Sequence, residues 1–340
     1  MSREVDNRHS FRPRGLLAGG HVQSILTSGP WRRWKVRRQA SDYLARSQRE
    51  VVTTEQGVQL LGFRNHSVHQ PASGLVILLH GWEGSSESNY LLSAASALDQ
   101  AGFDTVRLNF RDHGESHHLN LDLFHSCRLQ EVLDAVAELA GNYRHGPVFL
   151  VGFSLGGNFA LRVARHITDR DVALDRVVAV SPVVRPHHVL DALEGGLSLY
   201  QTYFERKWGR SLKIKQHLYP EHYRFDDWFR LKGLRARTEW LVEHCTDFPH
   251  LDAYLEGYAI DGDFLDDLET SSLIVTAADD PIIPASDFRR LARPRALEVE
   301  IHQRGGHCGF IENWRLDSWI ERRLVKELAP WQKRNVERAS

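Results

Sequence analysis

The chain has 340 residues and a net charge of −1, with 43 basic and 44 acidic side chains. This length allows a large core, and the near-neutral charge excludes a bulk attraction to nucleic acid. The three cysteines, Cys127, Cys245 and Cys308, lie far apart and match no zinc or disulfide pattern. The N-terminus has no apolar signal segment, and no run is apolar enough to predict a transmembrane helix. We therefore expect a cytoplasmic protein in a reducing compartment.

Strands and helices alternate along most of the chain. Residues 1–50 are interpreted as an irregular, basic N-terminal arm, and residues 51–68 as two short strands around a Gln-Gly turn. Further strands are expected at 75–81, 103–110, 147–154, 174–182, 271–280 and 296–303, and helices at 88–101, 121–141, 155–167, 285–292 and 314–328. Such alternation predicts an α/β fold with a mostly parallel sheet and helices on both faces.

The alternation is interrupted at residues 183–268, which are rich in charged and aromatic residues. We interpret this segment as a helical cap insertion in an α/β core formed by 51–182 and 269–330. Ligands in such folds bind at the carboxyl ends of the strands, where an insertion can cover them. The cap aromatics line an acyl pocket, form the cap's own core, or do both; they are Tyr200, Tyr203, Phe204, Trp208, Tyr223, Phe225, Trp228 and Phe229.

Ser154 lies between an apolar β-branched run and a helix-like segment, flanked by Gly152 and Gly156. A sharp strand-to-helix turn exposes a serine for nucleophilic attack, and small residues two positions away relieve the crowding. The helix N-terminus that follows favours developing negative charge. The alternative is an ordinary turn in which Ser154 only caps the helix.

A serine nucleophile needs a base, and the base needs a carboxylate to orient it. For this kind of turn the acid and then the histidine follow the serine in the chain. Asp279 and Asp280 come just after one expected strand, and His307 lies in a glycine loop after the next. We assign His307 as base and favour Asp280 as acid, because the residue before Pro281 is biased to an extended conformation. Asp279 remains the alternative.

An acyl-transfer site also needs donors for the oxyanion. The backbone N–H of Leu155, directly after the serine, is one candidate. The second usually comes from a loop after an early strand. In this chain that loop is 80–88, where Gly81 permits close approach, and we choose the backbone N–H of Trp82.

The motifs LLHGWEGSS, NFRDHGES, GFSLGGN, DDPIIP and GGHCGF, in this order, resemble the α/β-hydrolase superfamily. The early FRPRGLLAGGHVQSIL, residues 11–26, is similar to the N-terminal signature of its YheT-like branch of esterase and lipase-like hydrolases. The resemblance covers residues 11–325. It implies an α/β-hydrolase fold and a serine hydrolase that cleaves carboxylic esters through Ser154, Asp280 and His307. Asp112 stands where relatives more often have glycine, and we expect it to shape a loop.

Two polar clusters remain. His113, His117 and His118 are interpreted as surface histidines of a polar loop rather than as a metal site, and no metal or organic cofactor is expected. The run WRRWKVRR, residues 31–38, either contacts an anionic membrane surface peripherally or forms a solvated face with its tryptophans packed on the body.

We therefore expect a carboxylic ester hydrolase that acts on a small-molecule acyl ester through an acyl-enzyme. Two alternatives remain open. An acyltransferase would use the same three side chains with an alcohol or thiol in place of water. A non-catalytic relative would bind ligands on the same fold.

Overall fold

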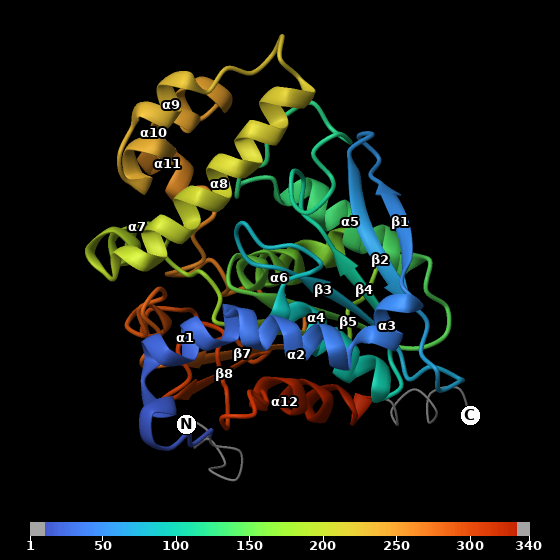
Figure 1. The fold of residues 1–340 in the computed structure, drawn as a ribbon. Coiled ribbons are helices and arrows are strands. Elements are labelled where there is room, and N and C mark those ends of the chain that lie inside the picture. Colours follow the sequence, from blue (N-terminus) through green and yellow to red (C-terminus); the bar gives the residue numbers. More distant parts are fainter. Residues whose placement is uncertain (1–10, 332–340) are drawn as a thin grey trace.

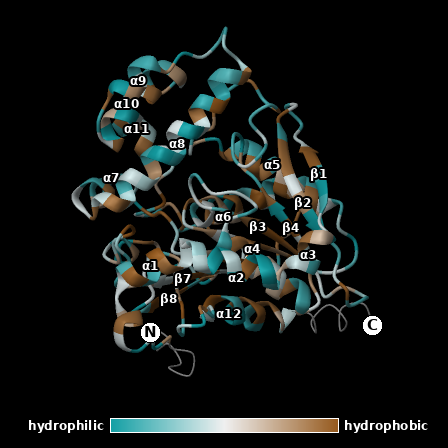
Figure 2. Ribbon diagram, in the orientation of Figure 1, coloured by the Kyte–Doolittle hydropathy of each residue, from teal (hydrophilic) through white to brown (hydrophobic). Residues whose placement is uncertain are grey.

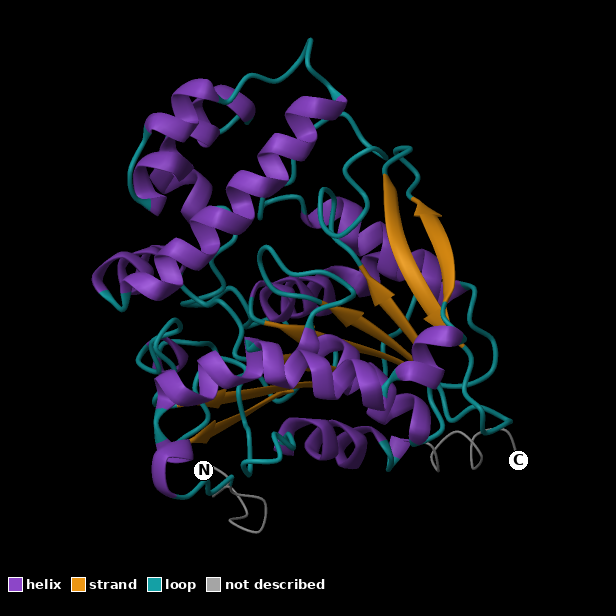
Figure 3. Cartoon of the chain, in the orientation of Figure 1, coloured by secondary structure: helices purple, strands orange, loops and turns teal. Residues whose placement is uncertain are grey.

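The computed structural model describes residues 11–331, so residues 1–10 of the expected arm lie outside it. One eight-stranded sheet runs through the chain in the order β1-β2-β4-β3-β5-β6-β7-β8 (Figures 1 and 3). The hairpin β1–β2 pairs antiparallel, and the six strands from β4 to β8 pair parallel. The strands are β1 Gln48–Thr53, β2 Gln59–Asn65, β3 Leu75–Leu79, β4 Asp104–Leu108, β5 Val148–Phe153, β6 Arg176–Val180, β7 Ser272–Ala277 and β8 Leu297–His302. The predicted α/β class is confirmed.

Helices cover both faces of the sheet because the central strands are apolar on both sides. In β3, Val76 and Leu78 pack with α4 (Asn89–Gln100) and α12 (Trp319–Leu328). The alternate residues of β3 pack with α5 (Leu129–Gly141) and α6 (Leu155–His166) on the other face. Figure 2 shows the resulting hydrophobic interior strands between more hydrophilic helices.

The expected insertion forms a helical cap between β6 and β7, at the upper left of Figure 1. Its longest helix, α8, follows α7 and runs diagonally beside the other cap helices in Figure 1. The cap helices are α7 Pro186–Gly195, α8 Ser198–Leu218, α9 Asp226–Arg230, α10 Leu234–Cys245 and α11 Leu251–Glu256. None of the helices in residues 11–331 is long and apolar enough to cross a membrane.

The prediction of an irregular N-terminal arm is wrong for the described part. A 3-10 helix, η2, covers Gly15–Ala18, and three helices follow: α1 Gly20–Ser28, α2 Pro30–Gln39 and α3 Ser41–Ala45. Helix α2 is held to the body by Arg32, which is buried and contacts Ser93 of α4 and Glu321 of α12. Because these partners lie far from residues 31–38 in the sequence, the basic run alone gave no sign that this helix packs against the body.

The tryptophans of α2 point outward. Trp31 is 77% exposed and Trp34 is 61% exposed, so the interpretation that both pack on the body is wrong. Basic side chains of the same helix instead bind the body, including Arg32 to Glu321 and Lys35 to Asp317. In this helix basic side chains therefore make the contacts with the body, and the tryptophans face solvent.

Candidate active site

Ser154 occupies the single position between β5 and α6. Its φ of 54° and ψ of −118° lie in a region that side chains other than glycine rarely adopt. The turn is held by a main-chain hydrogen bond of 2.9 Å from the Ser154 N–H to the Val180 carbonyl of the neighbouring strand. A serine on such a turn projects its hydroxyl away from the backbone.

The two flanking glycines are required by close backbone approach. A Cβ on Gly152 would lie 2.1 Å from the Gly156 carbonyl oxygen. A Cβ on Gly156 would lie 2.5 Å from the carbonyl oxygens of Leu79 and His80. The spacing read from the sequence thus reflects real crowding, because α6 begins directly against the end of β3.

His307 contacts both Ser154 and Asp280. Its Nε2 lies 2.9 Å from the Ser154 Oγ, and its Nδ1 lies 2.9 Å from the Asp280 Oδ2. The other oxygen of Asp280 accepts the main-chain N–H groups of Ile282 and Ile283 at 2.8 and 3.0 Å. A carboxylate held in this way keeps the proton on Nδ1, which leaves Nε2 free to accept the serine proton.

The structure places Asp280, and not Asp279, against the imidazole. The Asp279 carboxylate accepts the Gly306 N–H at 2.9 Å and lies 3.9 Å from the Arg304 guanidinium. It therefore ties the loop after β7 to the loop after β8. Asp280 therefore orients the His307 side chain, and Asp279 fixes the main chain beside it.

The loop 80–88 lies directly against the serine. A Cβ on Gly81 would be 3.1 Å from the Ser154 Cβ, and the Gly81 N–H donates to the Tyr90 hydroxyl at 2.9 Å. Trp82 and Leu155 line the same cavity as Ser154. Their placement is compatible with the predicted backbone donors.

Two buried histidines support this loop, and sequence reasoning missed their role. The Nε2 of His80 accepts the Phe110 N–H at 3.1 Å, and the Nε2 of His113 accepts the Glu83 N–H at 3.2 Å. Burial lowers the pKa of His80 to about 4 and that of His113 well below its ordinary value. Both rings are therefore neutral at pH 7 and can accept. The interpretation of His113 and His117 as surface residues is wrong, since both are buried, whereas His118 is exposed as expected.

Ser154 opens into a cavity between the body and the cap. Most of the wall is apolar, and polar side chains are few. The lining residues are Trp82, Phe124, His125, Ser126, Leu155, Val183, Pro186, Val189, Leu190, Leu193, Phe204, Trp208, Thr238, Leu241, Tyr254, Leu255, Tyr258 and Ile282.

Both interpretations of the cap aromatics hold for different residues. Phe204 and Trp208, on α8, line the cavity, and the Trp82 ring stacks on Phe204 with centroids 5.0 Å apart. Phe225 and Trp228 are buried within the cap. The cap therefore contributes part of the pocket and packs on a core of its own.

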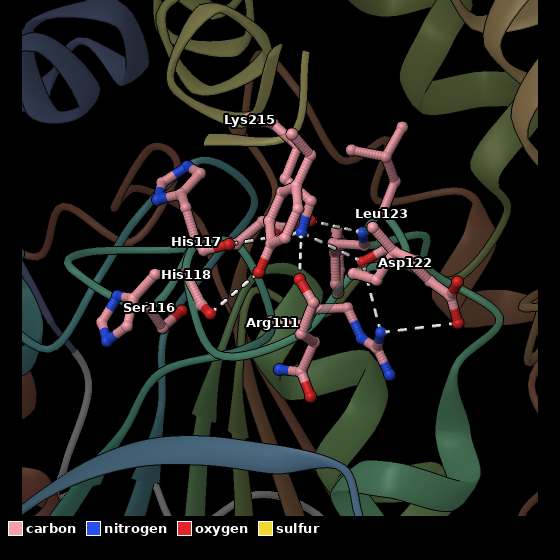
Figure 4. Close-up of polar contacts among 12 residues, drawn as sticks. Arg111, Ser116, His117, His118, Asp122, Leu123 and Lys215 are labelled. Carbon is pink, nitrogen blue, oxygen red and sulfur yellow. Dashed lines mark hydrogen bonds and ion pairs between the residues drawn. The ribbon is translucent and has the colours of Figure 1, made fainter. Parts of the chain in front are cut away.

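A buried lysine is one of the residues that join the cap to the body. Lys215 of α8 points into the loop after β4, where its ammonium lies 2.7 Å from the Asp112 carboxylate (Figure 4). The ammonium also donates to the carbonyls of His117, Asn120 and Asp122 at 3.3, 2.6 and 3.3 Å. These contacts hold residues 117–122 as a loop, and α5 begins only at Leu129 rather than near 121. Asp112 also accepts the Phe124 N–H at 2.9 Å, which agrees with the expected loop-shaping role.

No group of three or more His, Cys, Asp or Glu residues suited to a metal ion occurs within residues 11–331. Cys308, beside His307, is buried, and burial raises the pKa of its thiol far above the ordinary value. A protonated thiol of this kind is inert.

The amino-acid sequence is similar to those of two bacterial proteins. The chain is 27% identical over 274 residues to "Putative esterase YheT" of Escherichia coli (strain K12), which covers 75% of this chain and 76% of that protein. It is 28% identical over 255 residues to "Putative carbamate hydrolase RutD" of Caulobacter sp. (strain K31), covering 70% and 90%. The expected likeness to YheT-like hydrolases is thus confirmed.

Solved structures show the same fold. The Pyrococcus furiosus esterase Pf2001 superposes with a TM-score of 0.57 at 15% identity, covering 86% of this chain and 94% of that one. The family described as "alpha/beta hydrolase fold" matches residues 74–313, which include the serine turn, both aspartates and His307. The chain therefore belongs to the alpha/beta hydrolase fold family.

Proposed function

We propose that this protein is a serine hydrolase that cleaves carboxylic esters through an acyl-enzyme. The observation that carries the proposal is the continuous hydrogen-bonded chain from Ser154 through His307 to Asp280, with both contacts at 2.9 Å. At one end of this series of hydrogen bonds, Ser154 faces a mostly apolar cavity. The hydrolase relatives support the general class, and the geometry supports the serine chemistry.

The proposed reaction has two halves. The Ser154 Oγ attacks the ester carbonyl carbon while the Nε2 of His307 takes the hydroxyl proton. The N–H groups of Trp82 and Leu155 stabilise the negative oxygen of the tetrahedral intermediate. The carbon–oxygen bond to the alcohol then breaks, and His307 gives its proton to the departing alkoxide. Water attacks the acyl-enzyme by the same route and releases the acid.

The cavity favours a substrate with an apolar acyl group. Side chains such as Leu190, Leu193 and Phe204 surround the space next to Ser154, and they offer no charge to a bound ligand. Burial of apolar surface in such a site supplies most of the binding free energy. We therefore propose an uncharged acyl ester as the substrate.

The test is hydrolysis of a series of p-nitrophenyl esters with acyl chains of increasing length, together with an aryl carbamate. We expect the wild type to release nitrophenol in a burst followed by steady turnover, and Ser154→Ala to show neither. Preference for the carbamate would move the proposal to a carbamate hydrolase, which breaks the carbon–oxygen bond to the phenol and passes through a carbamoyl-enzyme. Transfer of the acyl group to an added alcohol or thiol, in preference to water, would favour the acyltransferase. Binding without turnover would favour the non-catalytic alternative.

A further inference from the structure

We propose that helix α1 is a built-in support for the catalytic loops, and that Ser24 is a positioning residue for His307. The inference rests on the proposed function in one respect, since it concerns the side chains of the proposed triad. Helix α1 lies outside residues 74–313, which the family match covers. It is therefore an addition to the part of the fold that supplies the triad.

Ser24 binds the main chain of His307. Its hydroxyl oxygen accepts the His307 N–H at 2.8 Å and donates to the Gly20 carbonyl at 2.8 Å. The residue is buried, so water cannot replace the contact. The two residues that flank His307 both have a positive φ, 56° at Gly306 and 53° at Cys308. A loop in this conformation persists only where its surroundings hold it.

The start of α1 fits between the acid loop and the base loop. A Cβ on Gly20 would lie 2.0 Å from the Asp279 carbonyl oxygen, and a Cβ on Gly306 would lie 2.3 Å from the Gly20 carbonyl oxygen. The backbone of α1 thus touches both loops at once. Only glycine fits at Gly20, because the contact is with backbone and cannot be relieved by a side-chain rotation.

Gln23 binds the loop that carries His307 at Ile311, four residues after the histidine. Its amide oxygen accepts the Ile311 N–H at 2.6 Å, and its amide nitrogen donates to the Ile311 carbonyl at 2.9 Å. The nitrogen also donates to the Leu17 carbonyl at 2.6 Å. Gln23 is fully buried, and all these hydrogen bonds are made to backbone groups. Together with Ser24, it holds the loop at two points around His307.

Helix α1 also reaches the cap. The His21 Nδ1 lies 3.0 Å from the Tyr200 hydroxyl of α8, and the two rings stack with centroids 5.8 Å apart. Residues 20–24, read as GHVQS, therefore contact the acid loop, the cap, the base loop and the segment after it. Each polar or glycine residue of this stretch has a defined contact, and we assign its function to loop support.

The experiment compares Ser24→Ala with three controls. Ser24→Thr keeps the hydroxyl. Ser28→Ala changes an exposed serine one turn further along α1, and Val36→Ala removes buried volume from α2, whose side chains hydrogen-bond residues 87, 93, 315–317 and 321. All measurements are made well below each variant's melting temperature. The reactivity of the site is measured as the rate constant for fluorophosphonate labelling and as kcat and KM on an ester. The order of the loop is measured as the rate of amide hydrogen exchange in the peptide 303–311.

We expect Ser24→Ala to lower the labelling rate constant and kcat about tenfold, the factor that one neutral hydrogen bond supplies, with KM nearly unchanged. Exchange at 303–311 should rise about tenfold. Ser24→Thr should recover most of both, and Ser28→Ala should match the wild type. Val36→Ala should lower the melting temperature but leave the labelling rate constant unchanged.

Wild-type labelling and exchange in Ser24→Ala would overturn the inference, as would an equal loss of labelling in Val36→Ala. An unlabelled wild type would contradict the proposed function instead. In that case the exchange of 303–311 alone would still decide whether Ser24 holds the loop.

Discussion

The Ser154 turn and the N-terminal helix α1 both shape the site, but their contacts extend over different distances along the chain. The glycine spacing of the turn reflects neighbours within a few residues, because Gly152 and Gly156 meet each other across it, although Gly156 also meets Leu79 and His80. Helix α1 is defined by contacts with residues about 280 positions away, such as Ser24 with His307. Contacts between residues close in the sequence produce a spacing of residue types that can be recognised in the sequence. Contacts between distant residues produce no such spacing, and only the types of the residues remain visible.

The largest expected effect tests the division of roles between the adjacent aspartates. Asp280→Asn should lower kcat by about 10⁴-fold, because the amide cannot hold the required tautomer or stabilise the charged imidazole. Asp279→Asn should lower kcat less than about tenfold, since it retains an oxygen for the Gly306 N–H. Steady-state kinetics of both variants with one ester measures this difference. Equal losses would show that Asp279 shares the role of acid.

The next effect concerns the buried ion pair that joins the cap to the body. Lys215→Met should cost about 3–5 kcal/mol of unfolding free energy, because it leaves a buried carboxylate and three carbonyls without their donor. Burial already raises the pKa of Asp112 to about 6 despite the lysine. The double variant with Asp112→Asn should therefore lose less than the sum of the two single changes. Urea unfolding gives these values, and strict additivity would contradict the pairing.

A smaller effect is expected in the pH dependence of stability. Burial lowers the pKa of His117 from 6.5 to about 4, so this residue binds a proton more weakly when folded. Its contribution is complete above pH 6.5 and is lost as the pH falls towards 4. Over that window His117→Gln should reduce the slope of unfolding free energy against pH by up to about 1.4 kcal/mol per unit. The difference between wild type and His117→Gln cancels the contributions of other titrating groups, such as Asp112, to the slope. Equal slopes of unfolding free energy against pH in the two proteins would contradict the lowered pKa of His117.

The smallest expected effect on stability belongs to the exposed face of α2. Trp31→Ala with Trp34→Ala should change the unfolding free energy by less than about 0.5 kcal/mol, because neither side chain is packed. If this face contacts an anionic membrane, the same variant and Arg33→Glu with Arg38→Glu should float less with phosphatidylserine vesicles than the wild type. Equal flotation of all three proteins would refute the membrane contact.

The sequence predicted the parts of the site that follow strand ends. Ser154, Asp280 and His307 each lie after a parallel strand, so their common edge followed from the alternation of elements alone. The choice between Asp279 and Asp280 rested on a proline and needed the structure to separate them.

Other residues left no local signal. His113 lies in a polar stretch that suggests exposure, and only the Glu83 N–H and the packed loops around it explain its burial. Lys215 belongs to a helix with many charges, and nothing nearby distinguishes the one that enters the body. For Gln23 and Ser24 the one available signal was the resemblance at residues 11–26, which named a family but gave no contact.

The most direct test of the central claim is labelling with a fluorophosphonate probe, followed by mapping of the modified peptide by mass spectrometry. A serine activated by His307 reacts with such a probe, and a serine that only caps a helix does not. We predict a single modification on Ser154 of the wild type and none in Ser154→Ala or His307→Ala. Folded wild-type protein that stays unmodified, or labelling that persists in Ser154→Ala, would contradict the account.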